Sequence, residues 1–186
     1  MEQDAVKRVV LRRVSWMVIS WVTVVGLGIG MIAAVYNVTS VHGFRTGWQG
    51  IPVFFLLAGI TGRVANCKVI LEEDVLTVVG PLRTHRIPAT AIRDVVHETG
   101  GSLEIDLGQE ETLPVFAFGG SLVDYYVGSS RDAHYTVKAW WRSARAKSES
   151  PAEGVRAGWT WCRPADLSLA VAVIGGLIGA GLAGGF

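Results

Sequence analysis

The 186-residue chain has few cysteines, few charged residues and no excess of either charge. Its two cysteines, Cys67 and Cys162, are too few for a disulfide framework or a four-cysteine zinc site. Only 18% of the residues are charged, and 17 Lys and Arg against 16 Asp and Glu give a formal net charge of +1. Because proteins hold nucleic acid largely through its phosphates, this balance predicts that nucleic acid is not a partner.

Patterns that carry catalysis or metal binding are also missing. The chain has no G-x-S-x-G motif, and a G-x-G-x-x-A match at residues 28–33 lies inside an apolar run instead of after a strand. The histidines fall in separate segments without the i, i+4 spacing of helical metal sites: His42, His85, His97 and His134. The sequence therefore predicts a protein that is not an enzyme and holds no cofactor and no metal.

Apolar residues make up 50% of the chain, and the mean hydropathy of +0.38 is typical of a membrane protein. Three runs contain no charged side chain: residues 14–36, 46–62 and 167–186. The first and third are long enough to cross a hydrocarbon core of about 30 Å as helices, and the second is at the lower limit. We predict three crossings. A cleaved signal peptide is the alternative for the first run, and a re-entrant segment for the second.

Basic residues before the first run, and a single cation in the loop after it, predict the orientation. The amino terminus and the central residues are expected in the cytoplasm and the carboxy terminus outside, in the inner or plasma membrane. Trp159 and Trp161 are expected to anchor the start of the third crossing at the interface, and Arg63 to reach the headgroups from the end of the second.

Glycines four residues apart lie on one face of each long run. They are Gly26 with Gly30, Gly175 with Gly179, and Gly181 with Gly185. Small residues at this spacing allow helices to approach closely, which predicts helix packing or homo-oligomers. The alternative is the general abundance of glycine in membrane helices.

The central part of the chain has the short alternating runs of β-strands. Leu103, Ile105 and Leu107 fall on one face of a strand, and six or seven such strands predict a small antiparallel barrel or sandwich. A helix is expected over residues 129–147, with an apolar stripe of Val137, Trp140, Trp141 and Ala144. The predicted fold class is α+β, organised as a tail and helical hairpin (1–62), a β domain (63–147), a linker (148–166) and a last crossing (167–186).

Two segments of this domain resemble a known family. They are residues 68–78, K-V-I-L-E-E-D-V-L-T-V, and residues 86–95, which carry an I-P-x-x-x-I-x-x-V pattern. This order of segments resembles the bacterial membrane proteins with a pleckstrin-homology-like domain. The resemblance implies a seven-stranded, partly open barrel capped by a carboxy-terminal helix. That family is mostly of unassigned function, so the resemblance implies a fold more than an activity.

The candidate contact residues are Arg83, His85, Arg86 and Arg93. Acidic residues 72–74 occupy the hairpin at which eukaryotic pleckstrin-homology domains hold phosphate, which disfavours binding there. We expect a protein-interaction or scaffolding module, with membrane lipid and a protein partner or second copy as its contacts. The alternative is a sensor of anionic lipid that uses Arg83, Arg86 and Arg93. An ordinary solvated strand face also accounts for these cations.

Overall fold

The computed structural model describes residues 8–97, 102–108, 111–119, 129–147 and 154–183. It divides into two compact units, which are described separately below. The β unit comprises Met1–Arg13 and Cys67–Thr160, and the helical unit comprises Val14–Asn66 and Trp161–Phe186.

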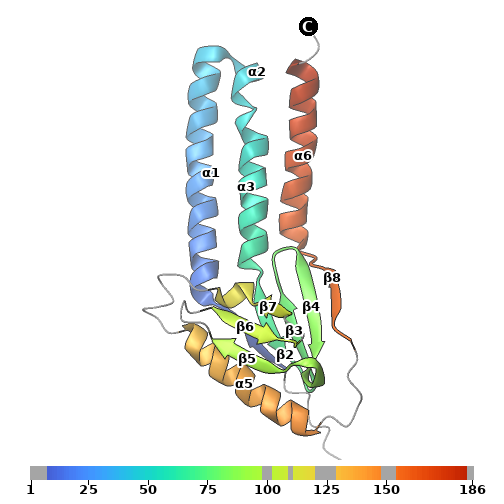
Figure 1. Cartoon of the computed structure of the whole chain (residues 1–186). Helices are drawn as coiled ribbons and strands as arrows, with labels where there is room; N and C mark the ends of the chain where they lie inside the picture. The colour runs from blue at the N-terminus through green and yellow to red at the C-terminus, as the bar shows by residue number, and fades with distance from the viewer. Residues whose placement is uncertain (1–7, 98–101, 109–110, 120–128, 148–153, 184–186) are drawn as a thin grey trace, which may run out of the picture. The chain divides into compact units, whose positions relative to one another are not determined.

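The β unit contains two antiparallel sheets (Figure 1). The five-stranded sheet has the order β1 (Val9–Leu11), β2 (Lys68–Leu71), β3 (Val75–Val79), β4 (Arg83–Pro88) and β8 (Arg156–Trp159). The three-stranded sheet has the order β5 (Asp94–His97), β6 (Leu103–Asp106) and β7 (Thr112–Pro114). The expected α+β class and antiparallel pairing are confirmed, but the described strands do not close into one barrel.

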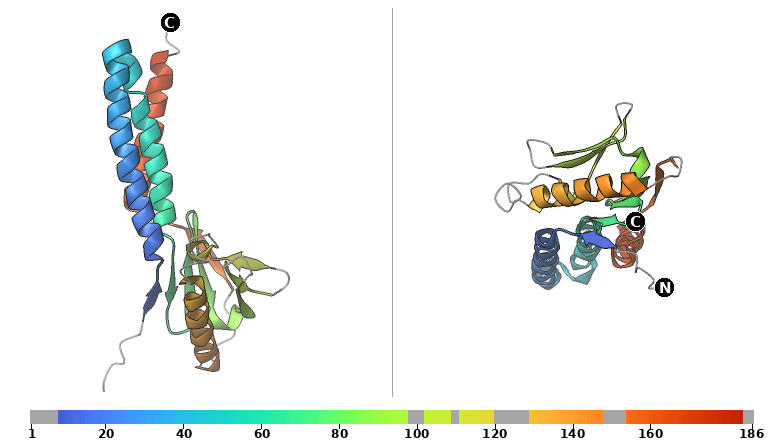
Figure 2. Two further views of the ribbon diagram at one scale, coloured as in Figure 1. Left: turned by 90° about the vertical axis from the view of Figure 1, so that its left-hand side faces the viewer. Right: turned by 90° about the horizontal axis from the view of Figure 1, so that it is seen from below.

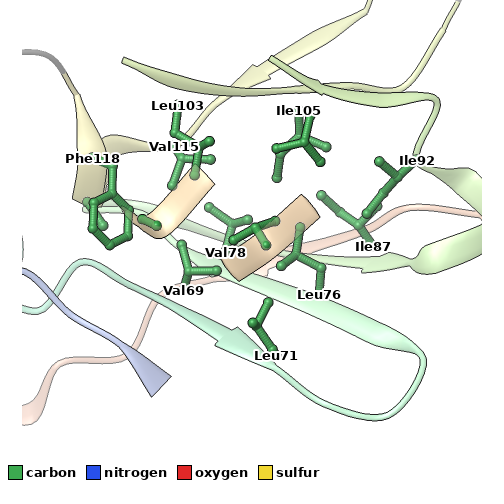
Figure 3. Packing of buried hydrophobic residues seen from close by; sticks show 14 of the residues in the cluster. Val69, Leu71, Leu76, Val78, Ile87, Ile92, Leu103, Ile105, Val115 and Phe118 are labelled. Atoms are coloured by element: carbon green, nitrogen blue, oxygen red, sulfur yellow. The ribbon is translucent and has the colours of Figure 1, made fainter. Parts of the chain in front are cut away.

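The core of the β unit lies between the sheets (Figure 3). Alternate residues of the strands supply it, as the period-two pattern predicts. Leu103 and Ile105 from β6 are fully buried, and so are Leu76 of β3 and Ile87 of β4. Short 3₁₀ turns at Ala89–Ala91 and Phe116–Phe118 add Ala89, Ala117 and Phe118 to the buried residues.

Helix α5 (Ser129–Lys147) has the bounds that the sequence predicts. Its apolar stripe covers the sheets, with Val137 fully buried. The two stripe tryptophans also donate hydrogen bonds, from Trp140 Nε1 to the Glu72 carbonyl at 2.6 Å and from Trp141 Nε1 to the Ala89 carbonyl at 3.2 Å. These bonds tie the helix to the ends of two strands while satisfying the buried indole N–H groups.

The five-stranded sheet includes strands from outside residues 63–147, the predicted bounds of the β domain. Strand β1 belongs to the sheet, although its residues were expected in the tail, and β8 and the start of α6 (Arg163–Ala183) lie in the expected linker. The Arg-Ala-Gly-Trp sequence of β8 has little intrinsic strand preference. Its pairing with β4 makes it a strand, and the Thr84 and Thr160 hydroxyls, 2.8 Å apart, extend the contact beyond its end.

The helical unit contains α1 (Val14–His42), α2 (Phe44–Gly47), α3 (Gly50–Ala65) and α6. Two of its helices, over Val14–His42 and Arg163–Gly181, are long and apolar enough to cross a membrane. Helix α3 has 16 residues, about 24 Å of rise, which is shorter than a hydrocarbon core of about 30 Å. A third crossing therefore stays a prediction.

Helix α3 lies between α1 and α6 (Figures 1 and 2). Glycines bring α3 and α6 together, because a Cβ on Gly59 would lie 2.7 Å from Leu169 Cγ and one on Gly175 would lie 2.8 Å from Pro52 Cγ. Gly179 similarly contacts the ring of Trp48. Gly175 and Gly179 thus have the packing role that their spacing predicts.

The other predicted glycines do not pack in this way. Added Cβ atoms on Gly26, Gly30 and Gly181 would meet nothing within 4 Å among the described residues, and Gly185 lies outside them. Within this chain the α1 pair is therefore not a helix-packing motif. Whether it pairs with a second copy stays a prediction.

The end of α3 and the start of α6 are joined by an ion pair. Arg63, which was expected to reach the headgroups, is 7% exposed and its Nη2 lies 2.5 Å from Asp166 Oδ1. The second carboxylate oxygen of Asp166 accepts the Cys162 N–H at 3.0 Å. Arg63 is in the last turn of α3 and Asp166 in the first turn of α6, where each charge is favoured by the helix dipole.

We predict that Asp166→Asn lowers the free energy of unfolding by about 2 kcal/mol, between the values for exposed and fully buried pairs. The amide keeps an acceptor for the Cys162 N–H but leaves Arg63 without its counter-charge. Chemical unfolding in detergent micelles measures the change. Because Arg63→Met removes the stranded charge, Arg63→Met with Asp166→Asn should lose less than the sum of the single variants. Additive losses would contradict the pairing.

Candidate functional site

The four predicted contact residues do not form one cluster. Directly paired residues of antiparallel strands share a face, so the Val78–His85 pair lies on the core side with the Leu76–Ile87 pair. Arg83 shares this side of β4, two residues before His85. Arg86 points to the opposite face of β4 from Arg83 and His85.

Arg86 has an acidic neighbour on its own face. Its Nη2 lies 3.5 Å from Glu72 Oε2, and the other oxygen of this carboxylate lies 3.7 Å from Arg8 Nε. Glu72 belongs to the acidic hairpin that was expected to repel phosphate. Glu72 also offsets part of the positive charge of Arg8 and Arg86 on this face.

Arg93 meets the turn between β6 and β7, which begins with Gly108. Arg93 donates its backbone N–H to the Asp106 carbonyl at 2.8 Å, and its Cδ would lie 3.8 Å from a Cβ on Gly108. Gly108 has φ +82°, a left-handed conformation that glycine adopts without strain. The Glu111 N–H closes the turn by donating to the Gly108 carbonyl at 3.0 Å.

Glu111 links this turn to β4, because its charge acts on His85. Burial is the main cause that lowers the pKa of His85 below its ordinary value, and the positive charge of Arg83 lowers it further. The negative charge of Glu111 opposes both. His85 is consequently neutral near pH 7, and Arg83 and Glu111 are the charged groups that act on it.

An exposed tryptophan completes this group. Trp159 of β8 pairs directly with Arg83, and Ala157 pairs with His85, so both lie on the same face as these β4 residues. Trp159 is 56% exposed. We name this surface the rim cluster, made of Arg83, His85, Glu111 and Trp159.

Sequence reasoning did not assign Trp159 to this surface. Its closeness to Trp161 and to an apolar run indicated an interfacial anchor, whereas the structure makes it part of the β-unit sheet. The only local signal was the tryptophan itself in a segment of small residues. Its neighbours are set by the pairing of β8 with β4, over more than 70 residues of sequence.

Comparisons with known proteins give no match, either to family models, to curated proteins or to solved structures. The pleckstrin-homology resemblance therefore remains a prediction. Among the residues that the structure describes, no three His, Cys, Asp or Glu side chains gather as a metal site would require.

We predict opposite effects on His85 from its two charged neighbours. Arg83→Gln should raise the pKa of His85, and Glu111→Gln should lower it further. Titration of the His85 ring by NMR, assigned with His85→Gln, measures both. Arg86→Gln, on the opposite face, is the matched control and should leave this pKa unchanged.

The direction of the His85 pKa shift also determines how the free energy of unfolding depends on pH. A histidine whose pKa is lower in the folded state makes its full contribution to the free energy of unfolding above its unfolded pKa of 6.5. This contribution is lost as the pH falls from 6.5 toward the pKa of the folded state. Arg83→Gln should therefore weaken the loss of stability below pH 6.5. A stronger loss would contradict the assigned role of Arg83.

Proposed function

We propose that this chain is a non-enzymatic integral membrane protein whose β unit is a protein-interaction or scaffolding module. The observation that carries the proposal is the exposed Trp159 beside Arg83 on the outermost strand of the sheet. Tryptophan and arginine are the residues most enriched at the energetic centres of protein interfaces. The absence of a catalytic motif from the sequence supports the non-enzymatic part.

The rim cluster has the mixed chemistry of a protein contact. Arg83 offers donors to carboxylates and carbonyls, Glu111 accepts, and the neutral His85 does either. Trp159 adds a large apolar surface with one N–H donor. We propose a partner that presents an acidic group next to an apolar one, because this pair of features complements Arg83 and Trp159.

In this proposal α1 and α6 cross the inner or plasma membrane of a bacterial cell, and α3 crosses with them. The amino terminus and the β unit are cytoplasmic, and the carboxy terminus is outside. Basic residues Arg8, Arg12 and Arg13 immediately before α1 support this orientation. The open face with Gly26 and Gly30 leaves a homo-oligomer as a further contact.

The alternative, a sensor of anionic lipid, has weaker support. Each cation near an anionic membrane surface contributes about 1 kcal/mol, so such a sensor needs several cations on one face. Arg86 faces away from Arg83, and Glu72 lies beside it. Glu111 offsets part of the remaining charge on the rim side.

Photo-crosslinking in cells tests the interaction proposal. A benzophenone amino acid at position 159 of the full chain should give a discrete protein adduct. The same amino acid at position 156 lies in the same strand but on the opposite face and should give little adduct. Arg83→Ala should reduce the adduct at position 159. Equal adducts at both positions, insensitive to Arg83→Ala, would contradict the rim cluster as the contact surface.

Vesicle flotation tests the alternative that the chain is a sensor of anionic lipid. The full chain in phosphatidylcholine nanodiscs should not float with phosphatidylglycerol vesicles at low salt. The triple variant Arg83→Gln, Arg86→Gln, Arg93→Gln should behave like the unmodified protein. Flotation that salt reverses and the triple variant loses would establish the lipid sensor instead.

A further inference from the structure

A groove of about 680 Å³ opens along the contact of α1 with α3. All its lining residues belong to the helical unit. Its inner part is apolar and includes Gly28, Ile32 and Phe54. Gly28 shapes this part, because the Phe54 ring lies 3.6 Å from the position of an added Cβ.

The groove covers one half of α1. Gly28 is the midpoint of Val14–His42, and Ser40 lies close to the end of the helix. The 12 residue steps from Gly28 to Ser40 correspond to a rise of about 18 Å. One leaflet of a hydrocarbon core is about 15 Å deep, so the groove has the depth of a single leaflet.

The lining of the groove is almost entirely apolar along its length. Tyr36, Thr39 and Ser40 are among the lining residues near the α1–α2 turn, but the Thr39 hydroxyl is buried and the Ser40 hydroxyl donates to the Asn37 carbonyl at 2.7 Å. Tyr36 is 78% exposed at this end. Exposed tyrosines are typical of the level of lipid headgroups. An apolar chain whose polar end lies beside Tyr36 matches this lining.

We propose that the groove binds one acyl chain of a bilayer phospholipid, in the leaflet at the α1–α2 turn. The tail lies along Ile32 and Phe54, and the ester and headgroup lie near Tyr36. The inference rests on the proposed membrane crossing of α1.

Photolabelling in a bilayer tests the site. The full chain is reconstituted in nanodiscs with a phosphatidylcholine that carries a diazirine on its acyl chain, and adducts are mapped by mass spectrometry. Gly28→Leu places a side chain in the groove, whereas the control Gly30→Leu places the same side chain where nothing lies within 4 Å. Adducts on Phe54 should fall about tenfold in Gly28→Leu and stay unchanged in Gly30→Leu.

A second pair of variants guards against misfolding of the first. Ile32→Trp fills the groove, and Ile29→Trp changes a 66% exposed position that is not part of its lining. Ile32→Trp should reproduce the loss of adducts on Phe54, while Ile29→Trp should not. Equal labelling in groove and control variants of both pairs would overturn the proposal, and so would an adduct-free Phe54 in the unmodified protein.

Carbonate extraction of membranes separates failure of this site from failure of the proposed function. Protein that stays in the membrane with equal labelling in all variants would exclude the groove alone. Protein that carbonate releases would exclude the membrane crossing on which the groove depends. A crosslink from a photoreactive residue at position 32 to a second copy would replace the lipid by a protein occupant and also overturn the proposal.

Discussion

The ion pair between Arg63 and Asp166 fixes the register of α3 against α6. A nearly buried guanidinium without a counter-charge is costly, so the end of α3 is held at the start of α6. With that point fixed and the helices antiparallel, Gly59 meets Leu169, then Pro52 meets Gly175, and finally Trp48 meets Gly179. The glycines permit close approach but do not select one register, because a shifted pairing would also bring small residues together. The charges supply this selection, and dispersion between the closely packed helices adds to it.

Helix α3 also packs against α1, on the side opposite to α6. Gly50 and Gly47 let α3 and the preceding turn approach α1, where Met31 and Thr39 would clash with added Cβ atoms. Further along α3, the large ring of Phe54 meets the glycine at the middle of α1. The helices therefore touch through a mixture of small and large residues, and the gap that remains is the apolar groove. A short α3 that packs on both neighbours thus leaves the apolar groove between α1 and α3.

How far the sequence predicts the structure depends on the range of the interactions involved. Strands β2 to β6 and helix α5 follow from local alternation and from the stripe at Val137, because burial of one face acts within each element. The sequence of β8 has no such pattern, and β8 is a strand because it pairs with β4. Of the four predicted contact residues, Arg83 and Arg86 lie on opposite faces of β4, because side chains alternate along a strand. The alternation of side chains along a strand was enough to assign Arg83 and Arg86 to different faces from the sequence. The contacts of Arg63 with Asp166 and of Arg83 with Trp159 could not be predicted in this way, because each joins segments that are distant in the sequence.

The same stretch of chain completes the sheet and leads into α6. Trp159 is the last residue of β8, and the Thr160 N–H donates to the Leu82 carbonyl at 3.0 Å. Only Trp161 and Cys162 separate Thr160 from the first residue of α6, and the Cys162 N–H is held by Asp166. Hydrogen bonds thus hold the chain on both sides of this short connection. A partner bound at Trp159 would therefore contact a strand that the chain connects to the apolar helix α6 through only three residues, Thr160, Trp161 and Cys162.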